Sequence, residues 1–233
     1  MSEAAVQARE LATSASQSAQ RGGEAARSVS QYVRAVEQSF SRNDLEGVFS
    51  LVEQGLGCGA YEEVRGTLLG LRALARFFSG DMTGCLHDGT EALHALSPGQ
   101  PRWYQVVGAL VNAAGLMGRH DTLRTLLTLL RQISPQPEAA AAKAEALASV
   151  VVMYGLGGAR SYALQTLDSS AALIDPESDS HMMAKGALQM ANSMFINMLE
   201  PDPFRALQLA EAGIVSFHTV GDRRQEGLCR IAC

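Results

Sequence analysis

The sequence predicts an all-α fold, because a helix-like apolar segment, a tight polar corner and a second helix-like segment recur along the chain. From Gly80 to Gly118, Gly158 and Pro201 the steps are 38, 40 and 43 residues. Only 6% of the residues are aromatic and 22 are glycine, a composition that suits close helix packing better than a sheet. This period is typical of stacked helical hairpins, so we expect an α-solenoid of about five antiparallel hairpins.

The expected elements follow in order. Residues 1–23 are polar and rich in Ala, Ser and Gln, and we expect a weakly helical or partly disordered leader there. The repeat domain is predicted over 24–220, and its helix pairs are expected at 24–42 and 44–56, 60–79 and 82–96, 102–117 and 120–133, 138–156 and 159–174, and 178–199 and 203–217.

Apolar residues recur at helical spacing within these segments. In the first pair, Val29, Val33, Val36 and Phe40 recur at steps of three and four residues, which places them on one helix face. The acidic residues of the corners are expected to cap helix starts or to lie in the first turn; they are Asp44, Asp121 and Asp202.

Residues 221–233 are predicted to begin a further helix that is cut short. A stacked array needs a polar capping repeat at its end, whereas Leu228, Cys229 and Ile231 are apolar. We therefore expect that the chain is a fragment of a longer array or associates with a second copy through this end.

The second helices of the pairs resemble tetratricopeptide (TPR) repeats. Small residues alternate with bulky ones and a proline follows the helix, as in Cys85, Gly89, Ala92-Leu93 and Pro98, or Ala163, Leu167, Ala171 and Pro176. The Gly-Asp corner of the family appears as Gly80-Asp81. The steps exceed the usual length of the family's repeats and resemble the long, degenerate arrays of bacterial multidomain transcriptional regulators and kinase–ATPase fusions.

The resemblance implies a right-handed superhelix whose concave groove is lined by the first helix of each pair. It places six candidate binding residues in that groove, and they are Trp103, Tyr104, Gln105, Asn112, Glu145 and Asn192. Amides suit recognition of a peptide backbone because each offers a donor and an acceptor. For Trp103 and Tyr104, packing between hairpins is the alternative. The expected partner is a protein or peptide in the groove.

Several classes of function lack their residues in the sequence. The net charge is −5 without a basic stripe, so no direct nucleic-acid partner is expected. No phosphate-binding loop, zinc-protease motif or nucleophile elbow appears, and we expect no enzyme activity, cofactor or metal. The four cysteines are read as reduced thiols, no membrane association is expected, and the predicted location is cytoplasmic.

The leading hypothesis is a non-catalytic protein-interaction module, part of a bacterial signalling or transcription regulator. The alternative is a small-ligand sensor domain of such a regulator, which binds an inducer in the concave groove. Methionines in the fifth pair and the interior glycines would leave room for a ligand; the glycines are Gly70, Gly108, Gly115 and Gly155. Close helix packing is the rival explanation of those glycines. An all-α enzyme and an RNA-reading hairpin array are weaker alternatives.

Overall fold

The computed structural model describes residues 30–175, 177–200 and 202–231, and every regular element in this part of the chain is a helix. The all-α prediction is therefore confirmed for the described residues. The expected leader at residues 1–23 and the beginning of the first predicted helix lie outside them.

The helices fall on the segments that the sequence predicts. A helix at residues 30–41 comes first. It is followed by α2 (Leu45–Gly57), α3 (Glu62–Ser79), α4 (Met82–Ala95), α5 (Pro101–Leu116), α6 (His120–Gln132), α7 (Ala140–Leu156), α8 (Arg160–Ala171), α9 (Met182–Leu199), α10 (Pro203–Thr219) and α11 (Arg223–Ile231). Short 3-10 turns at Pro137–Ala139 and Asp179–His181 precede α7 and α9.

The corners end one helix and begin the next by specific backbone geometry. Gly80 closes α3 in the left-handed conformation, with φ of 86°, which glycine adopts without steric cost. The Asp81 carboxylate then accepts a hydrogen bond of 2.8 Å from the Gly84 N–H and caps α4. Asp44 and Asp202 cap α2 and α10 in the same way, which confirms the caps predicted at these two positions.

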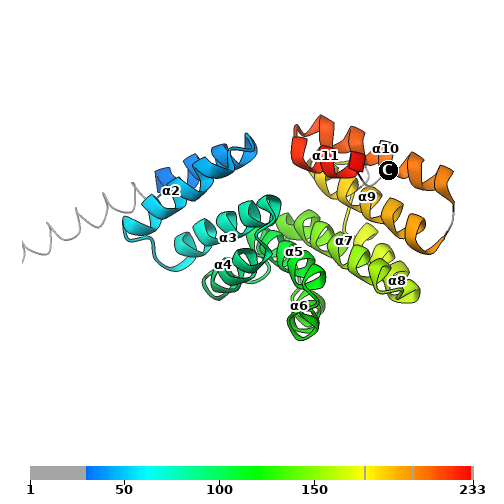
Figure 1. Ribbon diagram of the computed structural model, residues 1–233, viewed down its shortest axis with the longest axis horizontal. Coiled ribbons are helices and arrows are strands. Elements are labelled where there is room, and N and C mark those ends of the chain that lie inside the picture. Colours follow the sequence, from blue (N-terminus) through cyan, green and yellow to red (C-terminus); the bar gives the residue numbers. More distant parts are fainter. Residues whose placement is uncertain (1–29, 176, 201, 232–233) are drawn as a thin grey trace, which may run out of the picture.

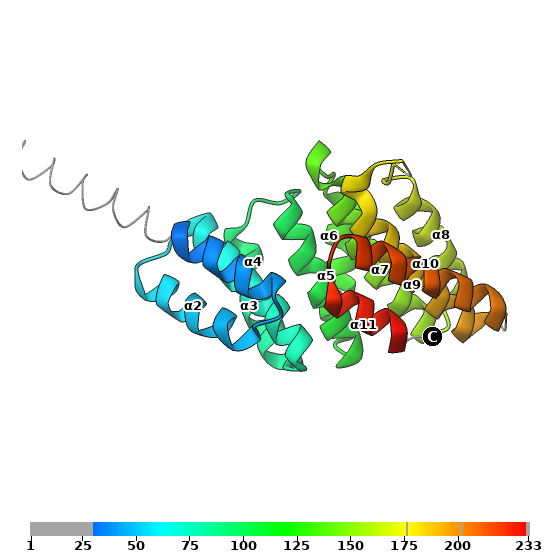
Figure 2. The same ribbon diagram turned by 90° about the horizontal axis from the view of Figure 1, so that it is seen from above.

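Sequential helices pack in pairs, and the first helix of each pair also packs on the first helix of the next. Contacts join α3 to α4, α7 to α8 and α9 to α10, while α3, α5, α7 and α9 contact one another in turn. Figures 1 and 2 show this arrangement, in which the helix at residues 30–41 and α11 lie on the same side of the row formed by α3, α5 and α7.

Glycines allow the close approach of these first helices. A Cβ atom at Gly70 would lie 2.8 Å from the Val106 side chain, and one at Gly108 would lie 3.3 Å from the Cα atom of Ala146. Such distances are too short for ordinary packing. Among the alternatives left open by the sequence, close helix packing therefore accounts for these two glycines.

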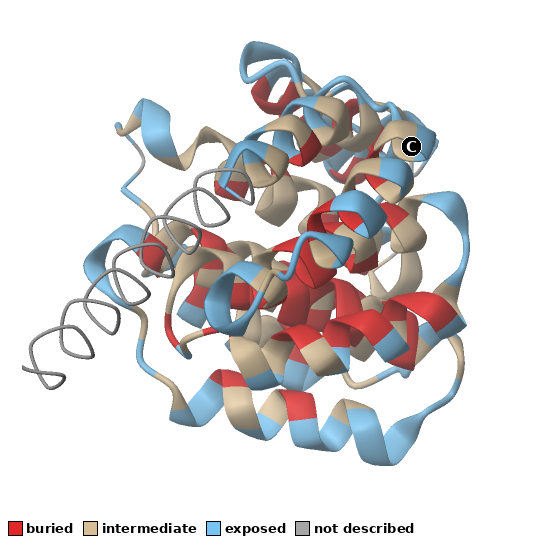
Figure 3. Cartoon of the chain, turned by 90° about the vertical axis from the view of Figure 1, so that its left-hand side faces the viewer, coloured by how far each residue is buried: buried red, intermediate tan, exposed pale blue. Residues whose placement is uncertain are grey.

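Buried residues concentrate where the helices meet, and exposed residues cover the outer faces (Figure 3). Trp103 and Tyr104 belong to the largest apolar cluster, and their rings meet edge to face with centroids 5.0 Å apart. The Tyr104 hydroxyl donates a hydrogen bond of 2.9 Å to the carbonyl of Ile133. Both rings thus pack between helices.

A partly buried ion-pair network joins α3 to α4. Asp88 is fully buried and accepts two hydrogen bonds, of 2.6 and 2.8 Å, from Arg72. Arg76 contacts the same carboxylate at 3.1 Å, and Arg72 also pairs with Glu53 of α2. This buried charge has a full set of partners, as a stable fold requires.

One segment of the described chain, Pro137–Leu156, has the length and apolar composition of a membrane-crossing helix, with a mean hydropathy of 1.4. It comprises α7 and the 3-10 turn before it. Because α7 packs against α5, α8 and α9, its apolar residues also meet the needs of a central core helix.

A candidate ligand cavity beneath the last helix

A cavity of about 740 Å³ lies on the inner side of the first helices. Its walls come from the helix at residues 30–41 and from α3, α5, α7, α9 and α11, together with Phe217 of α10. The volume lies within the range of pockets that bind small molecules. The second helices of the pairs, α4, α6 and α8, contribute no side chain to this wall.

The wall of the cavity is mostly apolar. Methionines project from α9, aromatic and leucine side chains from α3, and aliphatic side chains from α7. The main apolar contributors are Leu71, Leu74, Phe77, Phe78, Val152, Met153, Leu156, Met183, Met190 and Met194. Methionine side chains are flexible and polarizable, so this wall can adapt to the shape of an apolar guest.

Five charged side chains also reach the cavity. Arg102 of α5 pairs with Glu37 at 2.7 Å, and Arg224 of α11 lies 3.7 Å from the Asp222 carboxylate. Asp222 also caps α11, since it accepts hydrogen bonds from the backbone N–H groups of Arg224 and Gln225. The fifth charged residue is Glu145, near the middle of α7.

The Glu145 carboxyl differs from the other four charged groups because it has no ion-pair partner among them and its pKa is raised. Burial in the cavity and the negative charge of Asp222 raise the pKa of Glu145 from 4.5 to about 7. Glu145 is half-buried and lines the cavity. An acidic group in such an environment gains if a positive charge is placed beside it.

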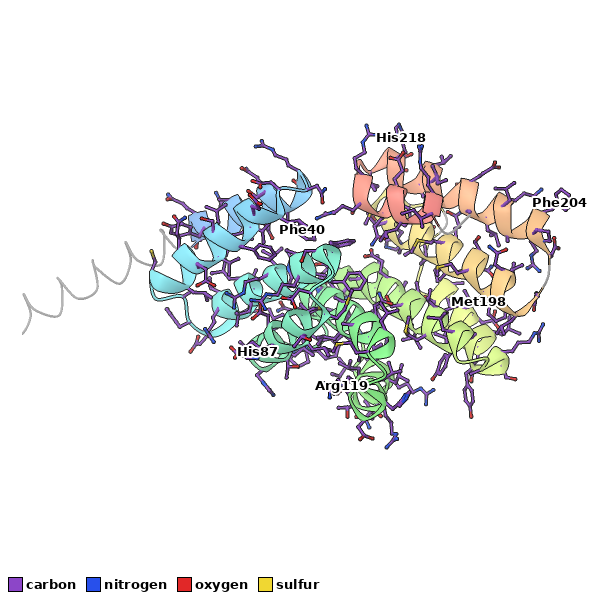
Figure 4. All side chains as sticks on the ribbon, in the orientation of Figure 1. Phe40, His87, Arg119, Met198, Phe204 and His218 are labelled. Carbon is purple, nitrogen blue, oxygen red and sulfur yellow. The ribbon has the colours of Figure 1, made fainter. Side chains whose placement is uncertain are left out.

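The last helix closes one side of the cavity through aromatic contacts. The Arg224 guanidinium carbon lies 3.7 Å from the ring centroid of Phe40 and 5.0 Å from that of Phe78. Figure 4 labels Phe40, which projects from the helix at residues 30–41. Burial lowers the pKa of Arg224, and Asp222 opposes this shift.

Two buried polar atoms of α11 lack a hydrogen-bond partner within the described part of the protein. They are Nη1 of Arg224 and Oε1 of Gln225. Both residues line the cavity. Because an unsatisfied buried polar atom costs about 1–3 kcal/mol, native proteins rarely keep one without a reason. One donor and one acceptor at the cavity wall are therefore available to water or to a guest molecule.

The structure brings four of the six predicted binding residues together in this wall. They are Tyr104, Gln105, Asn112 and Glu145. Gln105 accepts a hydrogen bond of 2.8 Å from Arg102, and Asn112 donates one of 3.0 Å to Ser149.

Trp103 and Asn192 lie elsewhere. Trp103 is 2% exposed and packs in the largest apolar cluster. Asn192 is half-buried on α9 and does not line the cavity.

Sequence reasoning missed the residues that α11 contributes. Asp222, Arg224 and Gln225 follow the corner at Gly221, where the sequence predicts only the start of another helix. This cluster of charged and polar residues next to a corner can be seen in the sequence. The same pattern occurs, however, at helix ends that are exposed to solvent.

The described residues hold no group of three or more His, Cys, Asp or Glu side chains that would bind a metal ion. Cys58 and Cys85 form no disulfide with a described residue, and the Cys229 thiol donates a hydrogen bond of 3.3 Å to the carbonyl of Ala210.

In comparisons with protein-family models, curated proteins and solved structures, none matched this chain. The resemblance to tetratricopeptide repeats therefore depends on the residues quoted for it alone.

Proposed function

We propose that this chain is a ligand-sensing module in which a small, mostly apolar molecule binds the cavity beneath α11. The observation that carries the proposal is the combination of an apolar cavity with two unsatisfied buried polar atoms, Arg224 Nη1 and Gln225 Oε1. Apolar walls with a few placed polar groups are the usual composition of small-molecule sites.

The proposal includes the architecture expected from the sequence, a right-handed α-solenoid of TPR-like hairpins. It is supported by the steps of 38, 40 and 43 residues between corners and by the packing of α3, α5, α7 and α9 on one another in turn. A solenoid that curves far enough brings its first and last helices close to each other, as at Phe40 and Arg224. In this view, the module belongs to a bacterial signalling or transcription regulator.

A ligand also has a physical means of changing the protein. A molecule in the cavity would contact both the helix at residues 30–41 and α11, since both helices line it. Ligand binding would then favour the closed arrangement of these two helices by its difference in affinity for the closed and open states. This is the kind of change that a regulator can transmit.

The experiment is a thermal-shift screen of small apolar molecules on the wild type and on an Ala187→Phe variant, whose new ring would fill part of the cavity. Ala187 lines the cavity on α9. We expect hits that stabilise the wild type and fail with the variant. Ala171→Phe, at an exposed position of α8, is the matched control and should keep every hit. Hits that stabilise all three proteins equally would contradict the proposal.

The second candidate is the protein-interaction module that the sequence predicts. Apolar side chains exposed along α10 favour it, since Phe204 is 80% exposed and Val215 64%. Figure 4 shows Phe204 at the outer end of that helix. Exposed apolar groups of this kind mark contact surfaces, and a second copy of the chain is the partner to test. Light scattering would show a dimer that Phe204→Ser dissociates; a monomer at all concentrations would count against it.

A further inference from the structure

The charged groups of the cavity leave one carboxylate without a counter-charge. Arg102 is paired with Glu37, and Arg224 is the cation nearest to Asp222. No arginine, lysine or histidine lies within ion-pair distance of Glu145 in the described chain. The cavity walls from α3 and α9 are uncharged. With every acid ionised, the described residues that line the cavity thus carry a single excess negative charge.

Burial disfavours the charged form of the Glu145 carboxyl. The side chains that line the cavity are mostly apolar. A carboxylate in such a place is costly unless it is paired. The near-neutral pKa of Glu145, which burial and the Asp222 charge cause, has the same physical origin. A single positive charge bound beside Glu145 would therefore be stabilised by electrostatic attraction to this carboxylate.

We propose that the cavity selects an apolar molecule with one protonated amine, whose ammonium group pairs with Glu145 beside Asp222. This inference rests on the proposed function and adds the chemical class of the ligand. Charge complementarity carries it, because a monovalent cation neutralises the excess carboxylate, whereas an anion would add to the negative charge.

The two unsatisfied atoms of α11 fit the same guest. Gln225 Oε1 can accept a hydrogen bond from an ammonium N–H, and Arg224 Nη1 can donate one to a neutral oxygen of the ligand. The charge of Arg224 is held by Asp222 and by the faces of Phe40 and Phe78, which limits its repulsion of an amine. The methionines of α9 would then cover the apolar body of the ligand.

The test uses three probes with the same apolar body, namely phenylbutylamine, phenylbutanol and phenylbutyrate, with isothermal titration of the full chain. We expect the amine to bind about tenfold more tightly than the alcohol, and the acid to bind most weakly. Glu145→Gln should remove the advantage of the amine and leave the affinity for the alcohol unchanged. Glu211→Gln, at an exposed position of α10, is the matched control and should change neither.

Proton release separates a direct charge pair from a structural effect of the substitution. At about pH 6 the Glu145 carboxyl is mostly protonated, and a bound ammonium group would expel that proton. Titration in buffers of different ionisation enthalpy should show release of a large part of one proton with the amine and none with the alcohol. The release should disappear in Glu145→Gln.

Equal affinity of the amine and the alcohol, tighter binding of the acid, or an amine preference that survives Glu145→Gln would each overturn the inference. If only the alcohol binds, the cavity is a ligand site and the inference about its charge is wrong. If none of the three binds the wild type, the inference is wrong as well. The proposed function is then still decided by the screen with the Ala187→Phe variant.

Discussion

Arg224 of α11 places its guanidinium carbon 3.7 Å from the ring centroid of Phe40, on the helix at residues 30–41. The contact joins the first and last helices that the structure describes. It also forms part of the cavity wall, because both side chains line the cavity. Closure of the cavity and cohesion between the two ends of the helix row thus depend on the same pair of residues.

Replacement of Arg224 by alanine is expected to loosen this closure. Loss of the contacts with Phe40 and Phe78 should lower the free energy of unfolding by about 1–2 kcal/mol. Urea denaturation measures that change, and hydrogen exchange should show faster exchange of the α11 amides. Arg124→Ala is the control, since its exposed side chain pairs only with Asp121 in the described chain. Slow α11 exchange in Arg224→Ala would contradict the role given to this contact.

Glu145 is expected to make stability depend on pH. Its pKa in the folded protein is raised from 4.5 to about 7, so the folded state holds the proton more strongly than the unfolded chain does. The resulting stabilisation is present below about pH 4.5 and is lost as the pH rises through about 7. The wild type should lose about 2–3 kcal/mol over this interval relative to Glu145→Gln.

Urea denaturation of both proteins between about pH 5 and about pH 8 measures this difference. The Gln variant should become the more stable protein at the upper end, because it carries no charge to bury. Parallel stability curves for the two proteins would contradict the burial of the Glu145 carboxyl.

Asp88→Asn is expected to be strongly destabilising. The substitution leaves Arg72 and Arg76 without the buried carboxylate that they share, and removal of one partner of a buried pair costs about 3–5 kcal/mol. Urea denaturation checks the value. Asp121→Asn is the control, because the Asp121 side chain is 95% exposed, and it should change stability by less than about 1 kcal/mol.

Gly186→Ala is expected to separate α9 from α10. A Cβ atom there would lie 2.8 Å from Cε1 of Phe217, and that ring is fully buried, so it has little room to move. Overpacking of this kind costs about 1–3 kcal/mol. Gly57→Ala in α2 meets no atom within 4 Å, and it should be neutral or slightly stabilising since alanine favours the helix. Thermal unfolding of the two variants compares these effects.

The helices were predictable because their signals are local. Gly80 and Asp81 are a helix stop followed by a cap, and both act this way in the structure. The stripe that includes Val36 and Phe40 follows helical spacing, and the two residues belong to one apolar cluster. Rules that act over a few residues therefore identify the elements and their ends.

The closed side of the cavity was not predictable in this way. Phe40 and Arg224 meet although they lie far apart in the sequence, and no pattern over a few residues encodes such a contact. Trp103 shows a related limit, since position on a first helix does not say which of its faces is buried. Glu145 reaches the cavity wall as expected, but its raised pKa comes from burial and from the charge of Asp222, which lies far along the chain.

The most direct measurement for the central claim is a crystal structure of the chain with the best ligand from the thermal-shift screen. We predict ligand density inside the cavity, in contact with Met190 and with the side chain of Gln225 on α11. Density only on the outer faces of the helices, with the cavity unchanged and filled by water, would contradict the claim that this protein is a ligand-sensing module.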